Sequence, residues 1–253
     1  MVAFPYKRVL VLGATSGIGL ALAERLIKEG SSVIACGRRQ ENLDEFVDKH
    51  NDDKNKDKAN AIRFDVTQLD QIPKFVEDVT CRFPDLDCVV LNSGIQRQFD
   101  FTKPGEVDLE LMGTEMLTNY TAHVTLTNVT SNLALIPLPR CLNYCASKAA
   151  LHQFILSLRQ QLQKTNIKII ELLPPAVQTE LHDEKHQPQI KNGREIGMPL
   201  AEFLEEAYSA LARGEMEIAV GEAREGQEAL EPERRRLMRE MMGLRMGGGW
   251  VDY

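Results

Sequence analysis

The sequence predicts an α/β fold in which helices cover both faces of one doubly wound parallel β-sheet. Short apolar runs rich in β-branched residues alternate with segments of helical periodicity through the first half of the chain, which is the pattern of βαβ units. The 253 residues are 43% hydrophobic and 26% charged, a balance typical of globular proteins. A chain of this length approaches the upper limit for one hydrophobic core. We therefore expect a single domain over residues 1–221 and a charged helical tail over residues 222–253.

The first half of the chain contains four predicted strands, at residues 9–12, 33–36, 61–64 and 88–91. A helix over residues 18–28 follows the first strand because its apolar residues form one stripe that stops before Gly30. A polar helix and a solvated loop at residues 49–58 precede the third strand, and a helix over residues 72–83 precedes the fourth. The fourth strand is apolar at every position, so we expect it to be buried.

The second half continues the alternation with longer helices. Amphipathic helices are expected over residues 144–163 and 199–213, and strands at residues 167–172 and 216–220. A charged helix and a glycine-rich end follow residue 221. The order of elements therefore remains that of a parallel α/β sheet.

A glycine-rich turn joins the first strand to the first helix, and it reads Gly13-Ala14-Thr15-Ser16-Gly17-Ile18-Gly19. Glycine lets the backbone approach a pyrophosphate closely, and the amide groups at the helix N-terminus then face its negative charge. Three glycines alone could equally form a plain tight turn. This set, however, follows a strand, opens an amphipathic helix and lies near the amino terminus. The context favours a Rossmann-type dinucleotide-binding turn.

The residues after the second strand distinguish the two nicotinamide dinucleotides. An acidic residue there binds the ribose hydroxyls of NAD(H), whereas arginine accommodates the 2′-phosphate of NADP(H). This chain has Gly37-Arg38-Arg39 and no carboxylate at that point. We predict NADP(H) rather than NAD(H) as cofactor, with Arg38 as the leading contact and Arg39 as the second. The alternative is that both arginines only cap a solvent-facing loop.

Tyr144 and Lys148 lie four residues apart near the start of a predicted helix, so their side chains share a face. An ammonium group beside a phenol favours the phenolate, which would bring the Tyr144 pKa toward a range useful for proton transfer. This spacing alone is a weak signal. Ser131 strengthens it, because it lies 13 residues before Tyr144 at the carboxyl end of an expected strand, where parallel-sheet sites form. Together the three predict proton transfer to a carbonyl oxygen.

These motifs follow one another along the chain together with two more, Asn92-Ser93-Gly94 and Asn119. In this order they resemble the classical short-chain dehydrogenases/reductases, and the likeness covers about residues 9–220. Residues 129–134 and 171–179 are most similar to the branch of that family named for D-alanyl-lipoteichoic acid biosynthesis. The branch name does not define a substrate.

The resemblance implies an oxidoreductase that transfers a hydride between NADP(H) and a small-molecule carbonyl or secondary alcohol. Tyr144 would be the proton donor, Lys148 would lower its pKa and hold the nicotinamide ribose, and Ser131 would polarise the substrate oxygen. Asn119 would hold a water in a proton relay. Residues 180–197 would form a lid over the substrate.

The resemblance also implies the cofactor contacts. Asp65 and Val66 would meet the adenine, and Thr179 would bind the carboxamide. The full set of predicted cofactor-binding residues is Gly13, Thr15, Ser16, Gly17, Ile18, Gly19, Arg38, Arg39, Asp65, Val66, Asn92, Ser93, Gly94, Tyr144, Lys148, Pro174, Val177 and Thr179.

Charge and cysteine content argue against several other partners. A net charge of −7 and a pI near 5.4 disfavour nucleic acid, which requires clustered Lys and Arg. The five cysteines form no C-x-x-C pair, so we expect reduced thiols and no metal. His182 and His186 could share a helical face as metal ligands, but a solvated lid helix is the favoured interpretation. Without a signal segment or a long apolar run, the sequence predicts a cytoplasmic protein with no membrane partner.

The segment between Asn119 and Ser131 is only 12 positions long, whereas similar family members fit the rest of a helix, a loop and a full strand there. A helix over residues 120–126 would descend about 10 Å and a strand over residues 127–130 would climb about 13 Å, which leaves no loop. We predict a shortened fourth helix, a fifth strand of only about two or three residues, and weakened homodimerisation. Two alternatives are a catalytically impaired dinucleotide-binding or interaction protein on the same fold, and a truncated gene model.

Overall fold

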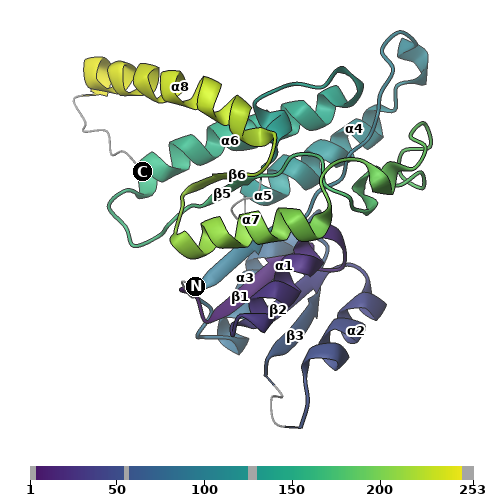
Figure 1. Cartoon of the computed structure of the whole chain (residues 1–253), viewed down its shortest axis with the longest axis vertical. Helices are drawn as coiled ribbons and strands as arrows, with labels where there is room; N and C mark the ends of the chain where they lie inside the picture. Colours follow the sequence, from purple (N-terminus) through teal and green to yellow (C-terminus); the bar gives the residue numbers. More distant parts are fainter. Residues whose placement is uncertain (1–3, 54–56, 125–129, 247–253) are drawn as a thin grey trace.

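A four-stranded parallel sheet forms the centre of the amino-terminal half in the computed structural model, which describes residues 4–53, 57–124 and 130–246 (Figure 1). Its strands are β1 (Arg8–Leu12), β2 (Ser32–Gly37), β3 (Ala59–Arg63) and β4 (Cys88–Leu91). They pair in the order β3-β2-β1-β4, so that Val9 lies opposite Val33 on one side and Cys88 on the other. The chain therefore winds outward on one side of β1 and then returns to its other side, which is the predicted doubly wound arrangement.

Helices cover both faces of this sheet. α1 (Gly17–Lys28) and α2 (Gln40–His50) pack on one face, and α3 (Ile72–Arg82) packs on the other. Successive strand residues point to opposite faces, so Val9 belongs to the α1 side and Leu10 to the α3 side. Every residue of β1 is buried. The predicted α/β fold, one domain on a parallel sheet, is confirmed.

The second half of the chain builds a smaller two-stranded sheet beside the first. Its strands β5 (Glu171–Leu173) and β6 (Glu217–Ala219) are parallel, and the long helices here are α6 (Leu142–Leu162), α7 (Leu200–Arg213) and α8 (Ala223–Met246). α7 lies beside α1 (Figure 1). Phe203 of α7 is buried in the core of the small sheet, whereas Tyr208 joins the core of the large one. α7 therefore connects the two sheets through a continuous apolar layer.

The remaining elements are short and lie mostly in the connections. They are η1 (Leu69–Gln71), η2 (Pro104–Glu106), α4 (Leu109–Met116), the π-helical turn η3 (Leu117–Thr121), α5 (Ala122–Val124), η4 (Asn132–Ala134), η5 (Pro139–Cys141), η6 (Glu180–His182) and η7 (Gly193–Glu195).

Two strand predictions were wrong in detail. The fourth strand was expected to be buried, but Val89 in the middle of β4 is 44% exposed. Among the described residues, β4 pairs with β1 and with no strand on its other side, so it is an edge strand of this sheet. The strand expected from residue 167 begins only at Glu171, and Ile167 is 59% exposed. An apolar run forms a strand only where a partner strand lies within hydrogen-bonding reach.

The short segment before Ser131 is described in part. The helix that carries Asn119 is continuous from α4 through η3 to α5 and is described as far as Val124. The predicted fifth strand falls mainly on residues 125–129, which lie outside the described residues. The Thr130 amide donates to Leu172 O (3.2 Å) and the Asn132 amide donates to Pro174 O (2.9 Å). The chain around Ser131 therefore runs alongside β5, while the length of the fifth strand and the weaker homodimerisation stay predictions.

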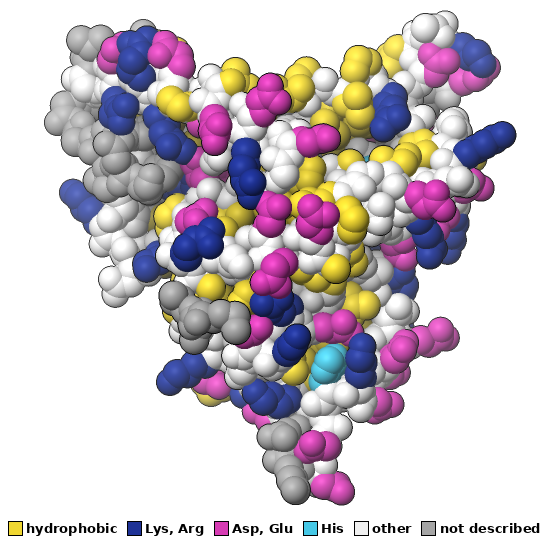
Figure 2. Space-filling model, in the orientation of Figure 1, with side chains coloured by type: hydrophobic (Ala, Val, Ile, Leu, Met, Phe, Trp, Pro, Cys, Tyr) yellow, Lys and Arg dark blue, Asp and Glu magenta, His cyan; other side chains and the backbone are white. Residues whose placement is uncertain are grey.

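The predicted charged tail begins as the helix α8, which includes Pro232. Within residues 4–53, 57–124 and 130–246, none of the helices has the length and apolar character needed to cross a lipid bilayer. Figure 2 shows acidic and basic side chains interleaved over the face that it presents.

Candidate active site

The loops at the carboxyl ends of β1, β2, β3 and β4 surround a cleft of about 580 Å³. Parallel sheets place ligand sites at this edge. The predicted site residues that line the cleft are Gly13, Thr15, Ser16, Gly17, Ile18, Arg38, Arg39, Asp65, Val66, Asn92, Ser93, Gly94, Ser131, Tyr144, Lys148, Pro174, Val177 and Thr179. Gly19 and Asn119 do not line the cleft. Gly19 packs against Gly13, and Asn119 binds Ile95.

The glycine turn packs too tightly for any other residue. Gly13 has φ of +79°, and a Cβ there would lie 2.8 Å from the Ser93 amide nitrogen. A Cβ on Gly19 would lie 2.2 Å from Gly13 O. The Gly13 and Ala14 amides donate to Cys36 O at the end of β2. The turn is therefore closed against both neighbouring strands, and it presents the N-terminus of α1 to the cleft as a pyrophosphate requires.

The two arginines after β2 point in different directions. Arg39 reaches over the glycine turn, where its Nη2 donates to Thr15 Oγ1 (2.8 Å) and to Ser16 Oγ (2.5 Å). Arg38 is 67% exposed, and its Nη1 lies 3.9 Å from Asp65 Oδ2. Asp65 accepts hydrogen bonds from the amide and the hydroxyl of Thr67, which fixes the loop after β3. Both arginines fit a phosphorylated ribose, and Arg39 is the one held against the turn.

Tyr144, Ser131 and Lys148 meet at the opposite end of the cleft. Burial raises the pKa of Tyr144, and a hydrogen bond with Ser131 opposes that rise. Lys148 Nζ lies 5.7 Å from the centre of the Tyr144 ring, and burial lowers the Lys148 pKa to about 8. The expected lowering of the Tyr144 pKa by Lys148 is not found, because burial is the largest cause and the only opposing one is the hydrogen bond with Ser131. The phenol is therefore protonated at neutral pH and is ready to donate rather than to accept a proton.

Asn119 acts on the loop after β4 instead of lining the cleft. Its Oδ1 accepts from the Ile95 amide (2.9 Å), and its Nδ2 donates to Ile95 O (2.8 Å) and Ser147 Oγ (3.3 Å). The side chain is completely buried. Lys148 Nζ lies 3.9 Å from the position that a Cβ would take on Gly94. Asn119 therefore joins the loop that carries Gly94 to the helix that carries Tyr144 and Lys148.

Two buried residues of this site were not predicted from the sequence. The Nε2–H of His123 donates to Ser93 O (2.5 Å), and burial followed by the nearby Lys148 charge lowers the His123 pKa to about 3. Glu115 accepts hydrogen bonds from the Arg97 amide and from Asn143 Nδ2, both at 2.7 Å, and burial raises its pKa. His123 lies four residues after Asn119, so the helical spacing was a usable signal.

The predicted lid segment lines the cleft in part, through Glu180, Leu181, His182, Lys185 and His186. Thr179 packs against Gly17, where a Cβ would lie 3.3 Å from the Thr179 Cβ. Within this segment, Gln187 Nε2 donates to Gln96 Oε1 (3.1 Å) in a buried hydrogen bond to the loop after β4. The expected solvated helix with His182 and His186 was wrong, because His182 is buried in the short turn η6. A metal site in the lid has no geometric support among the residues that the structure describes.

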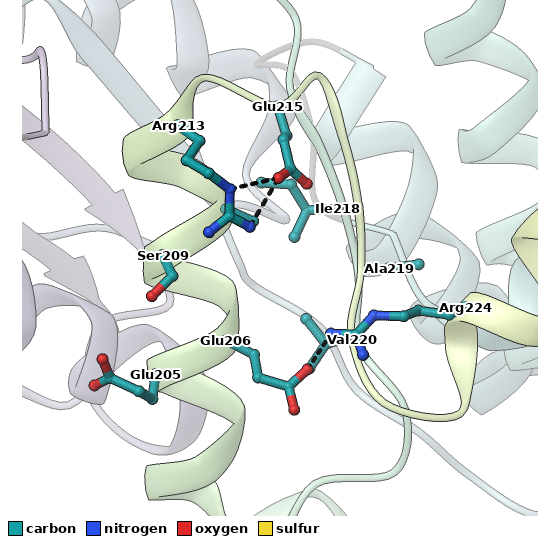
Figure 3. Close-up of a pocket in the computed structure, with 10 residues that line it drawn as sticks. Glu205, Glu206, Ser209, Arg213, Glu215, Ile218, Ala219, Val220 and Arg224 are labelled. Carbon is teal, nitrogen blue, oxygen red and sulfur yellow. Dashed lines mark hydrogen bonds and ion pairs between the residues drawn. The ribbon is translucent and has the colours of Figure 1, made fainter. Parts of the chain in front are cut away.

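A second hollow of about 470 Å³ lies between α7 and β6 (Figure 3). Its charged side chains already pair with one another, as Arg213 does with Glu215 and Arg224 with Glu206. Neither the glycine turn nor Tyr144 lines it. The chemistry is therefore assigned to the first cleft.

Comparison with known proteins agrees with this geometry. Residues 7–190 match the family model described as short chain dehydrogenase. The chain is 34% identical over 226 residues to DltE of Bacillus subtilis, described as an uncharacterized oxidoreductase, covering 83% of this chain and 86% of that protein. It is 32% identical over 188 residues to 11-beta-hydroxysteroid dehydrogenase-like 3 of Arabidopsis thaliana, covering 69% of this chain and 60% of that protein. The match to DltE agrees with the branch expected from the sequence.

Solved structures share the fold at lower identity. A short-chain dehydrogenase from Sphingobium yanoikuyae in complex with NADPH has a TM-score of 0.76 at 22% identity, covering 98% of this chain and all of that one (100%). An actinorhodin polyketide ketoreductase with NADPH has a TM-score of 0.71 at 23% identity, covering 87% of this chain and 97% of that one. These likenesses show the fold.

Proposed function

This chain belongs to the short-chain dehydrogenase family, and from that premise we propose that it is an NADP(H)-dependent oxidoreductase acting on a carbonyl or secondary alcohol. The observation that carries the proposal is the arrangement of one cleft. The glycine turn and Arg39 line the same cleft as Ser131, Tyr144 and Lys148. NADPH, when bound, supplies the hydride. Several structural relatives were solved with NADPH or NADP, which supports the choice of cofactor.

The chain's own residues hold and move the proton. In the reductive direction the protonated Tyr144 hydroxyl donates to the developing alkoxide, and Ser131 holds that oxygen by a hydrogen bond. Lys148 stays largely protonated at pH 7 because its lowered pKa is still about 8. Its charge lies beside Gly94 and the Tyr144 ring, where it stabilises the phenolate left after donation. The buried walls of the cleft exclude water from this step.

We expect the wild type to bind NADPH about tenfold or more tightly than NADH, because a charge-assisted contact to the 2′-phosphate is worth roughly 1.5–3 kcal/mol. Arg38→Asp should reverse the preference, and Arg39→Ala should weaken NADPH binding by about tenfold. Quenching of protein fluorescence by each cofactor measures the dissociation constants. Arg63→Ala is the matched control, because Arg63 is an exposed arginine at the end of β3 that does not line the cleft. Equal dissociation constants for the two cofactors in the wild type contradict the prediction.

Monitoring NADPH absorbance with a panel of ketones and aldehydes tests the proposed activity. A second candidate is a dinucleotide-binding protein without turnover, and it rests on the uncovered edge of β4 among the described residues. Cofactor binding with turnover of at least one substrate supports the enzyme. Binding without turnover of any substrate supports the second candidate.

A further inference from the structure

Glu180, the first residue of the lid, is bound by the donors that face the glycine turn. Arg39 Nη1 lies 2.8 Å from Glu180 Oε1, and the Ser16 hydroxyl donates to the same carboxylate oxygen. Arg39 is in turn held by Thr15 and Ser16. The Glu180 carboxylate therefore occupies donors of the Arg39 guanidinium and the Ser16 hydroxyl at the site where a phosphate group is expected.

A carboxylate and a phosphate cannot both occupy the same donors. Arginine binds either anion through the same fork of N–H groups, and both Arg39 and Glu180 line the cleft. The pair is only partly exposed, with 44% of the Arg39 side chain and 33% of the Glu180 side chain accessible. Water therefore screens it less than it screens a pair on the open surface.

The contact also fixes the start of the lid. Glu180 directly follows Thr179, which packs against Gly17 of the turn. Farther along, Gln187 ties the lid to Gln96 by an uncharged hydrogen bond. Of these two contacts, the one through Glu180 uses charged groups that line the cleft and are suited to bind phosphate.

We propose that Glu180 competes with the 2′-phosphate of NADP(H) for Arg39 and Ser16, so that this lid residue sets the affinity for the phosphorylated cofactor and couples its binding to release of the lid. The inference rests on the proposed cofactor. It identifies Glu180 as a residue that determines cofactor specificity and assigns it no part in the chemical step.

Glu180→Gln should tighten NADPH binding about threefold to fivefold, the size expected when a part-exposed ion pair no longer competes. NADH binding should change by less than about 1.5-fold, because NADH lacks the 2′-phosphate. Glu195→Gln is the matched control. It removes the same charge from the same lid, at an exposed residue that does not line the cleft. In an Arg39→Ala background, Glu180→Gln should leave NADPH binding nearly unchanged.

Hydrogen exchange without any cofactor provides a second readout. The amides of residues 180–186 should exchange several-fold faster in Glu180→Gln and in Arg39→Ala than in the wild type, whereas Glu195→Gln should leave them unchanged. Unchanged exchange in Glu180→Gln overturns the attachment of the lid. Equal tightening of NADPH and NADH, or tightening that persists in the Arg39→Ala background, indicates general charge repulsion and overturns the competition. A wild type that binds neither cofactor overturns the proposed function, and the competition with it.

Discussion

Tyr144→Phe is expected to remove detectable turnover while leaving the dissociation constant for NADPH within about twofold of the wild type. A positioned general acid contributes about 10²- to 10⁴-fold to the rate, and the phenolic hydroxyl, which carries that proton and bonds to Ser131, is the only group that this change deletes. Burial raises the pKa of Tyr144, so the wild-type hydroxyl carries its proton at neutral pH. Steady-state rates with any carbonyl that the wild type reduces, together with fluorescence titration by NADPH, measure the two quantities.

Two other variants make this result specific. Tyr208→Phe is the matched control, because Tyr208 lies in α7 against Arg25 and does not line the cleft. Lys148→Ala should impair both turnover and NADPH binding, since Lys148 lies beside Gly94 as well as Tyr144. Most of the wild-type rate surviving in Tyr144→Phe would show that another group donates the proton.

The central strands could be predicted from sequence because their signal is local. β1 and β2 are buried on both faces, so nearly every residue is apolar, and the structure extends each predicted strand by only one or two residues. The burial of strands at the sheet edges depends on partners that are distant in the sequence. Val89 and Ile167 were both expected in strands, yet both are exposed because burial requires a neighbouring strand or helix.

The candidate site was predictable where short spacing fixes geometry. The four-residue step from Tyr144 to Lys148 is a property of the helix itself, and the glycine turn requires a strand before it and a helix after it. From the sequence, Arg38 ranked above Arg39, whereas in the structure Arg39 is the arginine held against the glycine turn, because the direction of a side chain at the end of a strand depends on its contacts. The role of Glu180 depends on a contact with Ser16 that spans 164 positions of the chain.

A buried charge cluster joins the second half of the molecule and lies outside the cleft. His152 of α6 stands between two carboxylates, with Nδ1 2.7 Å from Glu171 of β5 and Nε2 3.2 Å from Glu231 of α8. All three side chains are at most 1% exposed. Burial opposes the charge on His152, but the hydrogen bonds to both glutamates raise its pKa to about 9. The Thr130 hydroxyl donates to Glu171 (2.7 Å), so the cluster also anchors the chain next to Ser131.

His152→Leu is expected to lower the free energy of unfolding by about 3 kcal/mol at neutral pH, the lower end for a broken buried pair, because Glu231 keeps Arg234 at 3.0 Å and Glu171 keeps Arg159 at 4.0 Å. The folded-state pKa of about 9 exceeds the unfolded value of about 6.5. The stabilisation is therefore complete below about pH 6.5 and is lost as the pH rises through about 9. Urea unfolding from pH 6 to 9 should show that the difference in unfolding free energy between wild type and variant shrinks as the pH rises.

His50→Leu is the control, since His50 faces a single, partly exposed partner, Glu24, at 3.7 Å. We expect this variant to lose less than about 1 kcal/mol of unfolding free energy. A difference for His152→Leu that is equally small, or that does not change with pH, would mean that His152 is not the charged centre of the cluster.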